Sequence, residues 1–92
     1  MFVTEDNYKV GLRVKINPRS RYAYQMIGSA YGITQSTEDC CGGWVSVMWY
    51  DRNGKQRFDN TYRISLGVEY GRDVSKTYDL ILDKKEQLEF EF

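Results

Sequence analysis

The side chains that most often carry out catalysis are scarce in this chain of 92 residues, which contains no histidine. Its two cysteines are neighbours, Cys40 and Cys41, and neither has an imidazole in the chain to activate it as a nucleophile. Two adjacent thiols also fall short of the four ligands of a structural zinc site. Glu38 and Asp39 stand side by side in a polar stretch, which is typical of a solvated charge pair. We therefore predict that the protein is not an enzyme and holds no metal or other cofactor.

A second group of residues is suited to binding. Residues 13–21 include four basic side chains and no acidic one, and tyrosines follow directly. Arginine interleaved with tyrosine suits an acidic peptide, a phosphate group or stacked bases. The candidate partner-binding residues of this stretch are Arg19, Arg21, Tyr22 and Tyr24. The alternative is a solvated strand face with tyrosines folded back on the domain.

A second candidate surface lies on the segment 44–50, which has the clearest strand pattern in the sequence. Its alternation places Val45, Val47 and Trp49 on one face, and we expect that face to enter the core. The opposite face of the strand presents Trp44, Met48 and Tyr50. Large rigid aromatic side chains anchor protein interfaces, so this row is a candidate docking surface. The alternative is that the last strand or the long early loop covers it.

The elements that must position these residues are short and separated by frequent turns. Asn53-Gly54 after the central strand predicts a tight hairpin, because both residues tolerate positive φ. A break is expected at Asp59-Asn60, and a polar loop or short turn of helix is expected over 65–76. The predicted strands cover 11–16, 27–34, 44–50, 55–58, 62–64, 78–82 and 88–92, with loops at 17–25 and 35–43. The fold class is therefore all-β: a small barrel of about five to seven short antiparallel strands.

Composition limits the classes of partner and the cellular location. Thirteen basic and thirteen acidic side chains give zero formal net charge, whereas nucleic-acid binders usually carry a positive excess. No apolar run approaches the length that a bilayer-spanning helix needs. The first residues carry no basic segment of the kind that begins a signal peptide. We expect one cytoplasmic domain over residues 1–92, with both thiols reduced and no membrane contact.

An ordered series of short motifs resembles a known domain family. The series runs Gly11-Leu12-Arg13-Val14, Gly32-Ile33-Thr34, Gly43-Trp44-Val45-Ser46-Val47-Met48-Trp49, Asn53-Gly54, Tyr62-Arg63-Ile64 and Tyr78-Asp79-Leu80. It is similar to the Mib/Herc-type SH3-like domain of Mind bomb ubiquitin ligases, which also appears in looser form in small phage proteins. The resemblance covers roughly residues 10–82 and leaves the segment 83–92 outside it. It implies an SH3-like barrel and protein or peptide binding, and a free-standing chain of this length is most similar to a small phage-encoded protein.

Three functions follow as hypotheses. The first is a module that docks a protein or peptide, as a phage-encoded modulator of a host protein would. The second is a nucleic-acid-binding small β-barrel, which rests on the basic stretch with its tyrosines. The third is a structural or assembly subunit, in which the strand 88–92 adds to a neighbour's sheet and forms a homo-oligomer. Within the fold, we expect Arg63 and Asp79 to form a partly buried pair that fixes the last turn.

Overall fold

Strands dominate the computed structural model, which describes residues 1–36, 43–69, 72–75 and 77–83. The elements are β1 (Arg13–Ile16), η1 (Ala23–Met26, a single 3-10 turn), β2 (Tyr31–Thr34), β3 (Trp44–Tyr50), β4 (Gln56–Arg63), β5 (Gly67–Glu69), β6 (Arg72–Ser75) and β7 (Leu80–Leu82). Every strand pairing is antiparallel. The predicted all-β class, with a small barrel-like arrangement of short antiparallel strands, is confirmed.

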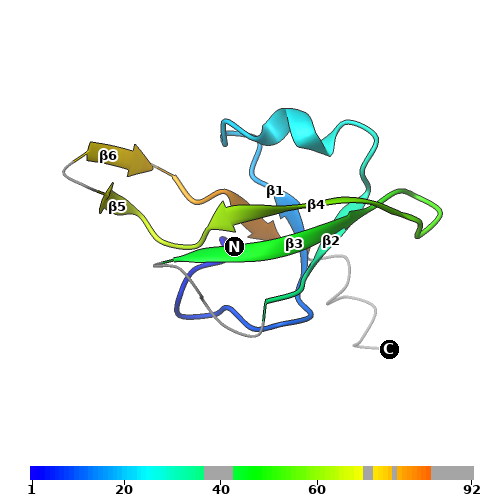
Figure 1. Cartoon of the computed structure of the whole chain (residues 1–92), viewed down its shortest axis with the longest axis horizontal. Coiled ribbons are helices and arrows are strands. Elements are labelled where there is room, and N and C mark those ends of the chain that lie inside the picture. The colour runs from blue at the N-terminus through cyan, green and yellow to red at the C-terminus, as the bar shows by residue number, and fades with distance from the viewer. Residues whose placement is uncertain (37–42, 70–71, 76, 84–92) are drawn as a thin grey trace.

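Five strands form one sheet in the order β4-β3-β2-β1-β7, and β5 pairs with β6 as a separate ribbon. Figure 1 shows this ribbon extending to one side, beyond the end of β4. The first residues of the chain lie along the outer edge of β7. Val3 donates its backbone N–H to the Leu80 carbonyl at 2.9 Å, Leu82 donates to the Met1 carbonyl at 2.9 Å, and Phe2 bridges to Ile81. This edge of the sheet is therefore already paired.

The core gathers on one face of the sheet, called the inner face here. As predicted, Val45, Val47 and Trp49 of β3 are buried there. The other buried hydrophobic side chains are Val3, Val14, Ile16, Tyr62, Ile64 and Leu80. Tyr22, Ala23 and Met26 from η1 and the residue before it pack against this cluster. Figure 1 shows the turn of η1 on one side of the sheet.

A hydrogen-bonded chain of three side chains crosses the core. The Trp49 Nε1–H donates to the Tyr62 hydroxyl at 2.8 Å, and that hydroxyl donates to Gln25 Oε1. The Trp49 and Tyr62 rings meet edge to face, with centroids 5.8 Å apart. Burial raises the pKa of Tyr62 to about 12. The buried hydroxyl is therefore kept neutral while it joins β3, β4 and η1.

Replacing Tyr62 by phenylalanine is expected to change how stability depends on alkaline pH. In the unfolded chain the tyrosine ionises near 10.0, whereas in the folded protein the raised pKa of about 12 keeps it protonated. The unfolded state then binds fewer protons, so the free energy of unfolding falls as pH rises through this window. Tyr62→Phe should remove that part of the fall. Urea unfolding followed by circular dichroism between about pH 9 and about pH 11 tests this, with Tyr24→Phe as the exposed control.

The β3–β4 hairpin forms at the predicted Asn53-Gly54 turn. Gly54 has a φ of 78°, and its N–H donates to the Asp51 carbonyl at 3.0 Å. The predicted break at Asp59-Asn60 is wrong, because β4 runs without interruption and these residues pair with Met48 and Val47 of β3. Regular pairing with a strong neighbouring strand outweighs the low strand propensity of Asp and Asn.

Other predicted boundaries also differ from the structure, and the first strand begins at Arg13 rather than at Gly11. The predicted loop or helical turn over 65–76 is wrong, since β5 and β6 lie within it. The second strand begins at Tyr31 rather than at Ile27, because residues 23–26 form η1 and Gly28 has a φ of 82°. The strand over 78–82 begins at Leu80. The predicted strand 88–92 and the two cysteines lie outside the described residues.

Asp79 joins three segments just before β7. Its buried carboxylate accepts a hydrogen bond from the Ser20 hydroxyl at 2.8 Å and one from the backbone N–H of Arg63 at 3.3 Å. Asn17 donates its backbone N–H to the Asp79 carbonyl at 2.8 Å. The contact between Asp79 and residue 63 is therefore made by the Arg63 backbone N–H and not by its guanidinium, as the predicted pair required, and the guanidinium reaches Ser65 at 3.4 to 3.5 Å.

Candidate functional site

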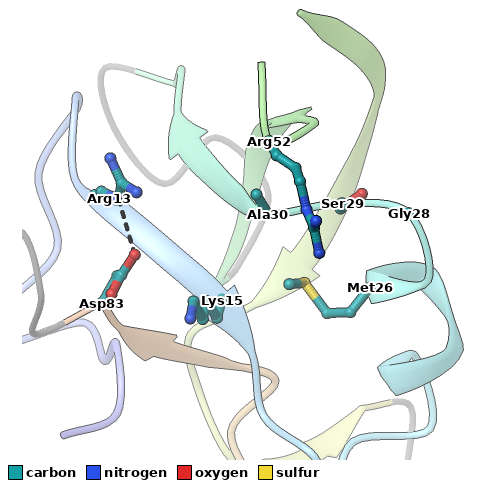
Figure 2. Close-up of a pocket in the computed structure, with 8 residues that line it drawn as sticks. All are labelled: Arg13, Lys15, Met26, Gly28, Ser29, Ala30, Arg52 and Asp83. Atoms are coloured by element: carbon teal, nitrogen blue, oxygen red, sulfur yellow. Dashed lines mark hydrogen bonds and ion pairs between the residues drawn. The ribbon is translucent and has the colours of Figure 1, made fainter. Parts of the chain in front are cut away.

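A pocket of about 460 Å³ opens beside the polar side of β1. The segment from η1 to β2 and the β3–β4 hairpin form its other walls. Its lining residues are Arg13, Lys15, Met26, Gly28, Ser29, Ala30, Arg52 and Asp83. Figure 2 shows the Arg52 side chain extending from the hairpin toward Met26, with Lys15 and Arg13 on the β1 side. Segments far apart in the sequence thus bring three basic side chains to one hollow.

More positive than negative side chains line this pocket. Arg13 Nε donates to Asp83 Oδ2 at 2.8 Å, in an ion pair whose carboxylate is almost fully buried. These two charges offset each other, so the positive charge of the pocket comes from Lys15 and Arg52. Within the part of the chain that the structure describes, neither of these two side chains forms a hydrogen bond or ion pair. The pocket therefore presents two cations that have no internal contact to break among the described residues.

Two stacked tyrosines stand next to the pocket. The rings of Tyr31 on β2 and Tyr50 on β3 pair across the sheet, with centroids 5.2 Å apart and planes 14° from parallel. The Arg13 guanidinium carbon lies 4.0 Å from the Tyr31 centroid. The Tyr31 hydroxyl reaches the hairpin, 3.7 Å from the place that a side chain at Gly54 would occupy. The Arg13 guanidinium and the rings of Tyr31 and Tyr50 thus form a row that leads from β1 to the β3–β4 hairpin.

The predicted row Trp44, Met48 and Tyr50 lies on the sheet face opposite the core, and all three side chains are half-buried. Tyr50 is the member that lies beside the pocket, through its stack with Tyr31. Trp44 stands at the opposite end of β3, where the Arg63 guanidinium carbon lies 5.3 Å from its ring centroid. Met48 lies between them and pairs with Asp59 and Ile33 of the neighbouring strands.

The structure separates the predicted basic stretch into two parts. Arg13 and Lys15 line the pocket, whereas Arg19 and Arg21 are exposed on the loop after β1 and do not line it. Tyr22 is half-buried, and its ring meets Tyr62 edge to face at 5.8 Å. The basic residues of the loop and those of the strand therefore belong to different surfaces.

Tyr24 is exposed, with 64% of its surface accessible to solvent. It belongs to η1, beside Gln25, whose side-chain amide donates to the Tyr24 hydroxyl at 3.2 Å. Ile27, directly after η1, is 79% exposed. These two side chains lie on the solvent side of η1 and outside the lining of the pocket.

Sequence reasoning missed the contributions of Met26, Ser29 and Arg52 to this site. Arg52 sits in a tight turn, where a basic residue predicts only an ordinary solvated surface. The alternation on β1 places Arg13 and Lys15 on the same side of the strand, but it gives no sign of these three residues. The antiparallel return of β3 along β2 was an available signal for Tyr31, because it sets that residue opposite Tyr50.

Among residues 1–36, 43–69, 72–75 and 77–83, no three or more Asp, Glu, Cys or His side chains gather closely enough to hold a metal ion. The same residues form no helix with the length and apolar character to cross a bilayer. In comparisons with known proteins, the chain matches no protein family, no curated protein and no solved structure.

Proposed function

We propose that this protein is a non-catalytic module that docks an acidic segment of a protein partner at the pocket beside β1. The observation that carries the proposal is the pair Lys15 and Arg52, which face the same hollow without an internal partner among the described residues. Tyr50 and Tyr31 extend the surface beyond the pocket with rigid aromatic contact area. The sequence resemblance to Mib/Herc-type domains supports the same class of partner.

Protein rather than nucleic acid is the favoured partner because of how the tyrosines are arranged. Bases bind to aromatic side chains by stacking on an open ring face. Tyr31 lies on β2, between β1 and β3, and its ring is flanked by the Arg13 guanidinium from one strand and the Tyr50 ring from the other. The zero net charge of the chain also gives no general attraction for a phosphate backbone.

Removing either cation of the pocket is expected to weaken binding of an acidic peptide. Lys15→Gln and Arg52→Gln should each raise the dissociation constant of a fluorescein-labelled, glutamate-rich peptide about three- to tenfold. The double variant should lose more than either single variant, because both cations face the same ligand. Fluorescence anisotropy at low and at physiological salt measures the effect.

Arg19→Gln is the matched control, because it removes a positive charge that is exposed, like that of Arg52, and lies outside the pocket. It should leave the dissociation constant unchanged. A larger loss with Arg19→Gln than with Lys15→Gln would move the site to the loop after β1 and contradict the proposal. Tighter binding of single-stranded DNA than of any acidic peptide, with a steep salt dependence, would favour the nucleic-acid function instead.

The resemblance also supports a cellular context for this proposal. We propose a cytoplasmic, phage-encoded protein that modulates a host protein by occupying its acidic segment. An assembly role, in which residues 88–92 add a strand to a second copy, is the alternative. Removing residues 84–92 and measuring the mass in solution tests it, and an unchanged mass argues against it.

A further inference from the structure

We infer that the anchor of the docked segment is a phosphorylated side chain, whose phosphate monoester enters the pocket between Lys15 and Arg52. This inference rests on the proposed function and names the chemistry of the ligand at the same site. Three features of the pocket carry it: its net charge, the geometry of its donors and the size of the space behind them.

The net charge of the pocket matches a doubly charged anion. Arg13, Lys15 and Arg52 carry three positive charges and Asp83 carries one negative charge, which leaves a net charge of +2. A phosphate monoester carries about −1.5 to −2 at pH 7. A single carboxylate would neutralise only half of this charge. The buried carboxylate of Asp83 already occupies Arg13, so the two remaining cations are the pair that a dianion would bridge.

The donors differ in a way that suits phosphate. The Arg52 guanidinium can present two parallel N–H groups to two phosphate oxygens, and the Lys15 ammonium can act as a compact charge on a third. Figure 2 shows Lys15 on β1 and Arg52 on the hairpin entering the pocket from different walls. A group with three oxygens can contact both walls together, whereas a planar carboxylate has two.

The space is larger than a bare ion needs. A volume of about 460 Å³ falls within the range of roughly 300–1,000 Å³ that small-molecule sites occupy. Met26 and Ala30 supply apolar lining next to the cations. A phosphorylated side chain has both parts, because its carbon atoms can contact Met26 while its phosphate meets Lys15 and Arg52. Free phosphate would leave the apolar wall unused.

The test compares ligands on the full chain by amide chemical-shift titration. The probes are blocked phosphotyrosine and phosphoserine, their unphosphorylated forms, inorganic phosphate and a glutamate-rich peptide. We expect a phosphorylated probe to bind at least about tenfold more tightly than its unphosphorylated form. The shifts should centre on Lys15, Ser29 and Arg52, and Lys15→Gln with Arg52→Gln should abolish the gain. Arg19→Gln should preserve it. Inorganic phosphate should bind more weakly than either phosphorylated probe.

A pH arm separates a dianion from a carboxylate. The second pKa of a phosphate monoester lies near about 6, so its charge falls between about pH 7.5 and pH 5.5. The groups that face it are Arg13, Lys15, Arg52 and Asp83, none of which is a histidine. Affinity for the phosphorylated probe should therefore fall with pH, and affinity for the glutamate-rich peptide should stay constant.

The outcomes distinguish the two proposals. If the glutamate-rich peptide binds at the pocket as tightly as the phosphorylated probes, the inference is overturned and the proposed function stands. If inorganic phosphate binds as tightly as the phosphorylated side chains, the site recognises an ion and the inference is overturned. If neither the peptide nor any phosphorylated probe shifts the pocket amides, both proposals fail.

Discussion

Gly32→Ala is expected to destabilise the fold by about 3 kcal/mol, and Gly32→Val to prevent folding, because β2 passes directly over the largest core side chain. A Cβ at residue 32 would lie 2.6 Å from Val47 Cγ1 and 2.7 Å from the Trp49 ring. Both neighbours are completely buried, so neither can move into solvent. A loss of this size lowers the thermal midpoint of a domain this small by roughly 15 °C. Thermal unfolding followed by Trp fluorescence measures it.

Gly11→Ala is the matched control for this substitution. Gly11 has a φ of 83°, but a Cβ there would meet no atom within 4 Å. Its replacement by alanine therefore adds backbone strain without overpacking. It should lower the free energy of unfolding by only about 1 kcal/mol. Equal losses at both positions would show that β2 can move away from Trp49, and the close packing described for the core would be wrong.

Asp79→Ala is expected to cost about 3 kcal/mol, because the substitution leaves two donors without their acceptor in a buried place. The Ser20 hydroxyl and the backbone N–H of Arg63 both donate to this carboxylate. Ser20, Arg63 and Asp79 are each less than one-tenth exposed, so water does not readily replace the lost acceptor. Urea unfolding gives the free energy. Amide exchange at residues 20–22 should accelerate more than exchange in β3, since the loop loses its attachment.

Two further variants provide comparisons for the stability measured with Asp79→Ala. Asp79→Asn keeps one acceptor oxygen in nearly the same shape, so its loss should be about half as large. Asp6→Ala removes an exposed carboxylate and should change stability by no more than about 0.5 kcal/mol. A loss with Asp79→Ala as small as with Asp6→Ala would mean that the three segments hold together without the carboxylate.

The sequence was most informative where one strong pattern determined the local structure. The alternation from Trp44 to Tyr50 predicted both the limits of β3 and the burial of Trp49, because a two-residue period has only one strand interpretation. The Asn53-Gly54 turn was equally specific. The long strand β4 was divided at Asp59-Asn60, since local propensity cannot show that the neighbouring strand will pair with both residues.

The candidate site was harder to predict because it is assembled from separate segments. The predicted basic stretch joined Arg19 to Arg13 by their closeness in sequence, but only Arg13 and Lys15 line the pocket. Arg52 joins them through the hairpin, from a position nearly forty residues later in the chain. Its role depends on how the hairpin lies against β1 and η1, and no local pattern encodes that arrangement. Tyr50 was identified correctly as facing away from the core, but its partner Tyr31 follows only from the strand register.

The pairing of Met1–Val3 along β7 has a consequence for how copies of this protein can associate. Fibre growth through strand addition needs two open borders on each molecule, one to receive a neighbour and one to offer to the next. Among the described residues, Met1–Val3 covers β7 at one border of the five-stranded sheet, and no segment pairs with the outer side of β4 at the other border. Two molecules that join at β4 would use up the open border of each. Edge-to-edge association that uses β4 alone therefore stops at a pair of molecules.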